Sequence, residues 1–213
     1  MLVAAFGDSI TAGVHLQEEQ TYLYMLGKRF DYAIRKAGFP GQTTRDALRL
    51  LEAEVLAFRP DVCILQFGMN DHVALSETDA KVPLPEFKTN LAHMAEQLQR
   101  IGTTLVLCTI HPIIEGDGRS YYYSRHPQQW YAPSGVSDRI RNYNAAIRDV
   151  AAGRGCMLAD IEADWERWLA QGNDLGQLLR TIENSGSNDG VHPTRLGHER
   201  YAACIAARLG GAL

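Results

Sequence analysis

Short apolar runs alternate along this chain with longer segments whose apolar residues recur at helical spacing. This alternation constrains the fold most, because it is typical of a parallel sheet covered by helices on both faces. Strands are predicted over residues 2–6, 32–37, 61–67, 103–110 and 156–161. We therefore expect an α/β fold of three layers, α/β/α, around a five-stranded parallel sheet.

The segments between these strands have helical periodicity. Ala47, Leu51 and Val55 lie on one stripe of a predicted helix, which Pro60 should stop before the third strand. A last helix should follow Pro193, since proline suits the first helical position, where its missing N–H would be unpaired anyway. The helices before the last one, including the one that contains Ala47, are predicted over residues 43–58, 86–101 and 137–152.

Two stretches, residues 69–85 and 111–135, are longer than ordinary connections. Loops of this length in compact domains are often functional. Both follow the carboxyl ends of predicted strands, where open α/β sheets bind their ligands. We therefore expect them at the rim of a site.

Length and composition indicate one globular domain over residues 1–213, since 46% of the residues are hydrophobic and 22% are charged. The net charge is −4 and the basic residues are scattered, which argues against a nucleic-acid partner. No run approaches the roughly 20 apolar residues that span a bilayer.

The location is expected to be cytoplasmic. The apolar stretch at the N-terminus is too short for the core of a signal peptide. The cysteines stand singly inside apolar segments, as buried reduced thiols do, at positions Cys63, Cys108, Cys156 and Cys204. A chain from which a leader had been trimmed would look the same.

Ser9 directly follows the first predicted strand, in the segment GDSITAG. A serine at a strand's carboxyl end, before a helix, projects its hydroxyl above the sheet edge, which is a nucleophile's position. The alternative is a turn that merely starts a helix. A phosphate-binding loop is excluded because no lysine follows the glycines, and Thr11 replaces the second glycine of a Gly-x-Ser-x-Gly elbow.

Near the other end of the chain, His192 stands before Pro193, which biases it away from helical backbone angles. A turn through Gly190 can bring the Asp189 carboxylate to one imidazole nitrogen. The other nitrogen would then be free to take a proton from a serine. The alternative is a polar loop that caps the last helix.

A hydrolase also needs donors for the oxyanion. The amide of Asn70, at the end of the third strand, and the backbone N–H of Gly41, after the second strand, are candidates. Asn and Gly are also ordinary turn residues. Together with Ser9 and His192, however, they fall on one predicted rim of the sheet.

This combination resembles the SGNH hydrolases, also called GDSL esterases and lipases. The matching segments are GDSIT with Ser9, GFPGQTT with Gly41, GMND with Asn70 and DGVHP with His192. The resemblance implies a flavodoxin-like fold and a triad of Ser9, Asp189 and His192. It also implies an oxyanion hole formed by the Ser9 and Gly41 N–H groups and the Asn70 side chain, with no cofactor or metal.

The chain departs from the family pattern at two motif positions and in one long segment. Ile10 replaces the usual leucine, and Ala37 stands where asparagine is common. Residues 113–133 match no family motif. Their aromatic side chains offer stacking faces for a sugar or walls for an acyl chain, although they could instead pack together or form a dimer contact. These candidate substrate contacts are Tyr121, Tyr122, Tyr123, Trp130 and Tyr131.

The remaining polar candidates are expected to have supporting roles. Asp8 and Asp71 are interpreted as hydrogen-bond acceptors rather than proton-transfer groups. The other histidines lack metal-ligand spacing and are interpreted as structural or surface residues: His15, His72, His93, His111, His126 and His198.

The sequence predicts a serine esterase that acts on small-molecule esters, with an acetyl group on a carbohydrate as the first choice. The reasons are the aromatic loop and the lack of a long apolar lid. The alternatives are a lysophospholipase or acyl thioesterase for longer chains and, from another class, a non-catalytic carbohydrate-binding domain.

Overall fold

Five parallel strands form the centre of the protein in the computed structural model, which describes residues 1–210. Their order across the sheet is β2-β1-β3-β4-β5. The predicted five-stranded α/β/α fold is confirmed, and each strand lies within two residues of its predicted bounds. The strands are β1 (Leu2–Gly7), β2 (Ala33–Gly38), β3 (Val62–Gln66), β4 (Thr104–Cys108) and β5 (Met157–Ala159).

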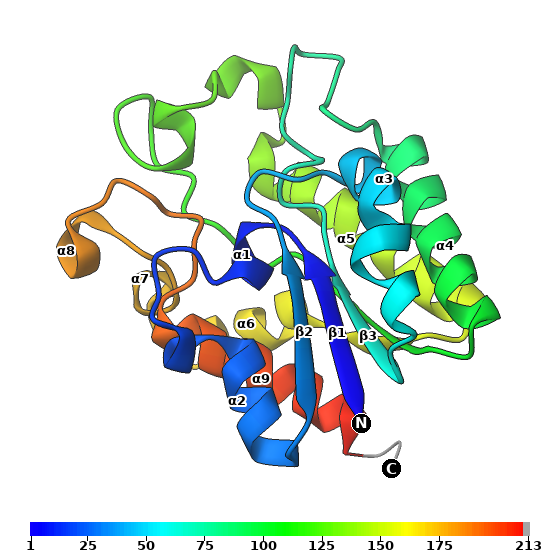
Figure 1. Ribbon diagram of the computed structural model, residues 1–213. Coiled ribbons are helices and arrows are strands. Elements are labelled where there is room, and N and C mark those ends of the chain that lie inside the picture. The colour runs from blue at the N-terminus through cyan, green and yellow to red at the C-terminus, as the bar shows by residue number, and fades with distance from the viewer. Residues whose placement is uncertain (211–213) are drawn as a thin grey trace.

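Helices cover both faces of this sheet (Figure 1). On one face α2 (Tyr22–Phe30) packs against α9 (Arg195–Leu209), which also contacts α6 (Ile161–Ala170). On the other face α4 (Leu84–Arg100) packs between α3 (Thr44–Glu54) and α5 (Gly135–Arg154). Because both faces are covered, all five residues of β3 are buried, which explains why the first four are apolar; only the last, Gln66, is polar.

Short helices and 3₁₀ turns occupy several of the connections between these elements. They are α1 (Ser9–Ala12), α7 (Leu175–Leu178), α8 (Ile182–Ser185) and the 3₁₀ turns Glu18–Gln20, Leu56–Phe58, Tyr122–Ser124 and Gln128–Tyr131. The long stretches 69–83 and 111–134 rise above the upper ends of the strands in Figure 1. In residues 1–210 no helix is both long enough and apolar enough to cross a membrane.

Two predicted helix boundaries are wrong. The helix predicted over residues 43–58 ends at Glu54, and a separate 3₁₀ turn follows, because the last turn of a helix often tightens where its carbonyls lack partners. Pro193 is not the first residue of α9. The hydroxyl of Thr194 caps that helix by accepting from the Gly197 N–H, so the helix begins at Arg195.

Candidate active site

Ser9 is the first residue of α1, directly beyond the end of β1. The Asp8 side chain caps this short helix by accepting from the Ile10 N–H at 2.9 Å. Gly7 is required because a Cβ there would overlap Thr11 Oγ1 and the carbonyl oxygen of Gln66. The turn therefore packs tightly against the sheet and presents Ser9 at its edge.

His192 and Asp189 lie on the loop before α9. His192 is 183 positions from Ser9 in the sequence. His192 Nε2 is 3.1 Å from Ser9 Oγ, and its Nδ1 is 2.9 Å from Asp189 Oδ2. Asp189 Oδ1 also accepts from the backbone N–H groups of Val191 and His192, each at 3.1 Å. The three side chains thus form one continuous hydrogen-bonded chain.

These contacts set the charge of Asp189. Burial alone would raise the pKa of this carboxyl, but the hydrogen bond and charge of His192 and the two backbone donors outweigh it and lower the pKa to about 2. Asp189 is therefore a carboxylate at any ordinary pH. That charge favours a proton on the imidazole nitrogen that faces it.

The stretch 111–135 braces the loop that carries Asp189 and His192. Arg125 donates through Nη1 to the Asn188 carbonyl and through Nη2 to the Asp189 carbonyl, the latter at 2.5 Å. The Tyr121 N–H donates to Asn188 Oδ1 at 2.5 Å, and the Ile114 N–H donates to the Gly190 carbonyl at 2.9 Å. Sequence reasoning missed Arg125, because nothing near it in the chain marks it as a partner of this loop.

Gly41 and Asn70 lie at the carboxyl edge, where the sequence placed them. Gly41 has a φ of 80°, a left-handed conformation that favours glycine. One Asn70 amide hydrogen is used to donate to the Gln42 carbonyl at 2.9 Å, which fixes the side chain. The amide has a second hydrogen, and Asn70 lines the same pocket as Ser9.

Asp8 and Asp71 are buried hydrogen-bond acceptors beneath this edge. Asp71 Oδ1 accepts from the N–H and hydroxyl of Thr44 at 2.8 and 2.5 Å, which ties β3 to the start of α3. Burial raises the pKa of Asp8 to about 7 and that of Asp71 to about 6. The nearby charge of Asp71 adds to the rise at Asp8.

The aromatic residues of the long stretch mostly pack together instead of facing solvent. Tyr122, Tyr123 and Tyr131 are buried, and the Tyr131 hydroxyl pairs with the Tyr122 hydroxyl at 2.8 Å and accepts from the Ala74 N–H at 2.9 Å. The Tyr121 hydroxyl donates to Glu183, and Trp130 is half-buried. Of the five, only Tyr122 lines the pocket that contains Ser9.

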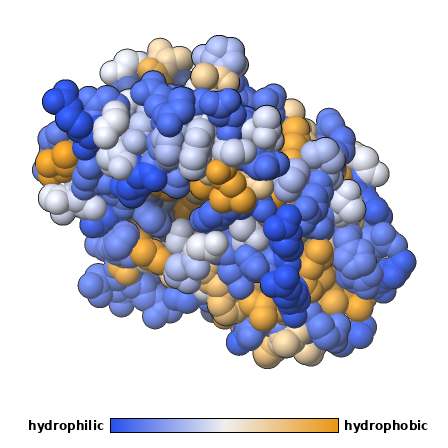
Figure 2. All heavy atoms as spheres, turned by 90° about the horizontal axis from the view of Figure 1, so that it is seen from above, coloured by the Kyte–Doolittle hydropathy of each residue, from blue (hydrophilic) through white to orange (hydrophobic). Residues whose placement is uncertain are grey.

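That pocket has a volume of about 310 Å³. Its apolar wall includes Met69, Val73 and Tyr122, and its polar side includes Arg125 and Asn188. Figure 2 looks down on this edge of the molecule and shows a mostly hydrophilic surface with hydrophobic residues beside a hollow near its middle. The site therefore offers a small apolar space next to groups that can hydrogen-bond.

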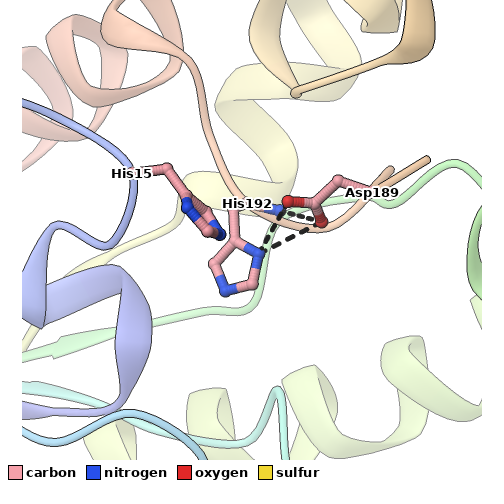
Figure 3. A group of neighbouring side chains, drawn as sticks. All are labelled: His15, Asp189 and His192. Carbon is pink, nitrogen blue, oxygen red and sulfur yellow. Dashed lines mark hydrogen bonds and ion pairs between the residues drawn. The ribbon is translucent and has the colours of Figure 1, made fainter. Parts of the chain in front are cut away.

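His15 also lies in this site, although the sequence indicated a structural or surface residue. Its ring meets that of His192 edge to face, with ring centroids 5.1 Å apart (Figure 3). It comes from the turn after α1, far from His192 in the chain. No spacing signal in the sequence could have paired them.

Comparison with known proteins identifies the family. A sequence model of the GDSL-like Lipase/Acylhydrolase family matches residues 5–200. The uncharacterized lipoprotein YqeF of Bacillus subtilis is 34% identical over 177 residues, which cover 76% of this chain and 73% of that protein. Esterase TesA of Pseudomonas aeruginosa is 28% identical over 109 residues, 49% of this chain and 51% of that protein.

Solved structures agree with this match. The acetyl xylan esterase AlAXEase has a TM-score of 0.73 at 26% identity, covering 97% of this chain and 98% of that one. A lipase/acylhydrolase from Enterococcus faecalis has a TM-score of 0.76 at 24% identity, covering 100% and 96%, and shows the shared fold. As its sequence motifs predicted, the chain belongs to the GDSL-like lipase/acylhydrolase family and is a carboxylic ester hydrolase.

Proposed function

We propose that this protein is a serine esterase in which Ser9 is the nucleophile, His192 the base and Asp189 the residue that orients the base. The observation that carries the proposal is the hydrogen-bonded chain from Ser9 Oγ through His192 to Asp189, at 3.1 and 2.9 Å. Three residues from the two ends of the sequence meet there in the order that acyl transfer needs.

In the proposed reaction, His192 Nε2 takes the proton of Ser9 while Ser9 Oγ attacks the ester carbonyl. The Ser9 and Gly41 N–H groups and the Asn70 amide donate to the resulting oxyanion. As the intermediate collapses, the ester C–O bond breaks and the leaving alcohol takes the proton from His192. A water molecule, deprotonated by His192, then releases the acid and restores Ser9.

The proposed substrates are esters of small acyl groups, with O-acetyl groups on carbohydrates as the first choice. The pocket of about 310 Å³ gives a short apolar wall and a polar side suited to hydroxyl-rich alcohols. The similarity to an acetyl xylan esterase at 26% identity supports this choice.

A longer acyl chain is the alternative, supported by the 28% identity to Esterase TesA over half of the chain. Rates on nitrophenyl acetate and nitrophenyl decanoate separate the two. We expect kcat/KM at least about tenfold higher for the acetate, because a decanoyl chain would leave most of its length outside the apolar wall. A preference for the decanoate would replace our proposal with the alternative.

Covalent labelling separates a catalyst from a binding domain on the same fold. A fluorophosphonate should label the wild-type protein at Ser9 and fail to label Ser9→Ala, whose circular dichroism spectrum and Tm should match the wild type. Label retained by a folded Ser9→Ala variant, or ester hydrolysis near the wild-type rate, would overturn the assignment of the nucleophile.

The cytoplasmic location stays a prediction. The relative from Bacillus subtilis is named a lipoprotein, which supports an anchored or exported form as the competing proposal. Cell fractionation of the native host, with antibody detection of this chain, distinguishes the two.

A further inference from the structure

The side chains of His15, His192 and Asp189 lie close together (Figure 3). One possible ligand atom from each, an imidazole nitrogen or a carboxylate oxygen, lies within 4.8 Å of the other two. His15 comes from the turn after α1, whereas Asp189 and His192 share the loop before α9. Two separate segments therefore contribute to the cluster.

Two imidazoles and one carboxylate are a common ligand set for zinc, which they bind at about 2.0–2.2 Å. Ligand atoms around a tetrahedral ion at that distance lie a little over 3 Å apart. The pair of His192 Nδ1 and Asp189 Oδ2, 2.9 Å apart, is already near this spacing, and the His15 nitrogen lies within 4.8 Å of both side chains. His15 is exposed, so its ring can turn toward the ion, and water can fill the fourth position.

We propose that His15, His192 and Asp189 form a reversible inhibitory site for a divalent transition cation such as Zn²⁺. Binding requires only the three side chains. Inhibition rests, in addition, on the proposed role of His192 as the base. Because Asp189 faces Nδ1 of His192 at 2.9 Å, the cation would bind that nitrogen. It would release the Nδ1 proton to solvent and draw electron density from the ring, which weakens Nε2 as the base for Ser9.

The charges around the cluster set the expected strength of binding. Arg180 opposes the cation, because its Nε lies 3.8 Å from Asp189 Oδ2. We therefore expect a weak, exchangeable site instead of a permanently filled one.

Calorimetric titration of the whole protein with ZnCl₂ tests binding without using catalysis. The informative variant is His15→Asn, since asparagine tolerates the φ of 71° at this position and its amide is a poor zinc ligand. His93→Asn removes an exposed histidine on α4 and is the matched control. We expect one zinc per wild-type chain and at least about tenfold weaker binding in His15→Asn.

Ester hydrolysis measured with and without zinc tests inhibition. Each variant is compared with its own activity in a chelator. Relative to that baseline, the inhibitory zinc concentration should rise in His15→Asn by the same factor as the Kd and should stay at the wild-type value in His93→Asn. Unchanged zinc affinity in His15→Asn would overturn the site. Zinc that binds through His15 without slowing hydrolysis would leave the site standing but overturn its inhibitory effect, and would count against His192 as the base.

Discussion

The two halves of the proposed catalytic site are held in different ways. The Ser9 turn is fixed by its own neighbours and by the sheet, with the buried Thr11 hydroxyl 3.0 Å from the Tyr22 hydroxyl and 3.2 Å from Gln66 Oε1. The loop with Asp189 and His192 lies above the sheet and depends on hydrogen bonds from Arg125 and other residues of the stretch 111–135. The proposed nucleophile, Ser9, is thus positioned by its neighbours in the sequence, whereas His192 is positioned by distant segments.

The largest effect on kcat is expected from removing the charge of Asp189, which positions His192. Asp189→Asn should lower kcat by about 10³–10⁴-fold, since the amide favours the wrong imidazole tautomer and cannot stabilise the imidazolium. Its side-chain oxygen can still accept from the Val191 and His192 N–H groups, so the loop should keep its shape. Steady-state kinetics and a thermal melt measure both, and an unchanged kcat would remove Asp189 from the mechanism.

A smaller effect on kcat is expected from substituting Asn70, which lines the same pocket as Ser9. Asn70→Ala should reduce kcat by about 10²-fold with less change in KM, because the amide is proposed to bind the oxyanion more tightly than the ground-state carbonyl. It also loses the bond to the Gln42 carbonyl. A change confined to KM would mean that Asn70 binds the ground state and is not an oxyanion donor.

The bracing of the loop can be tested without touching the triad. Arg125→Ala deletes both hydrogen bonds to the Asn188 and Asp189 carbonyls and should lower kcat by roughly tenfold by loosening His192. Fluorophosphonate labelling of Ser9 should slow in parallel. Arg119→Ala is the control, since that side chain lies on the same stretch and is 94% exposed. Equal effects of the two substitutions would refute the bracing role.

The same contrast explains what the sequence could predict. The strands and the turn at Ser9 depend on apolar runs and on neighbours within a few residues, so pattern alone located them. Asp189 and His192 are three residues apart and bonded to each other, so their pairing was also readable. That these two residues lie next to Ser9 could not be predicted from the pattern, and the assignment of the triad depended on the family resemblance.

Contacts between distant segments were out of reach of the pattern. Arg125 and His15 carry no motif, and their importance lies in neighbours more than 60 positions away. The aromatic residues of the stretch 111–135 were interpreted as candidate substrate contacts, yet Tyr123 and Tyr131 are buried in its interior. A tyrosine suits either environment, and only the packing around it decides.

The smallest effect on activity is expected from substituting Asp8. This substitution instead tests whether the turn beneath Ser9 holds a protonated acid. Asp8 is fully buried, and among the described residues its Oδ2 has no hydrogen-bond partner, as suits a protonated acid. Its folded-state pKa of about 7 lies above the ordinary value of 3.8, chiefly through burial, and the charge of Asp71 adds to the rise. Between pH 3.8 and about pH 7, the folded protein therefore keeps a proton on Asp8 that the unfolded chain has released.

Because of that difference, the stabilisation from protonated Asp8 is complete below about pH 4 and is lost as the pH rises through 7. Asp8→Asn cannot ionise and keeps an oxygen for the Ile10 N–H. Relative to the wild type, its free energy of unfolding should thus increase between pH 5 and pH 8, on the order of 2 kcal/mol, while kcat changes only a few-fold. Urea unfolding at the two pH values measures this, with Asp79→Asn, at an exposed position, as the control. If both variants follow the wild type equally from pH 5 to pH 8, Asp8 is already ionised in the folded protein, and the turn beneath Ser9 holds a buried charge instead of a buried acid.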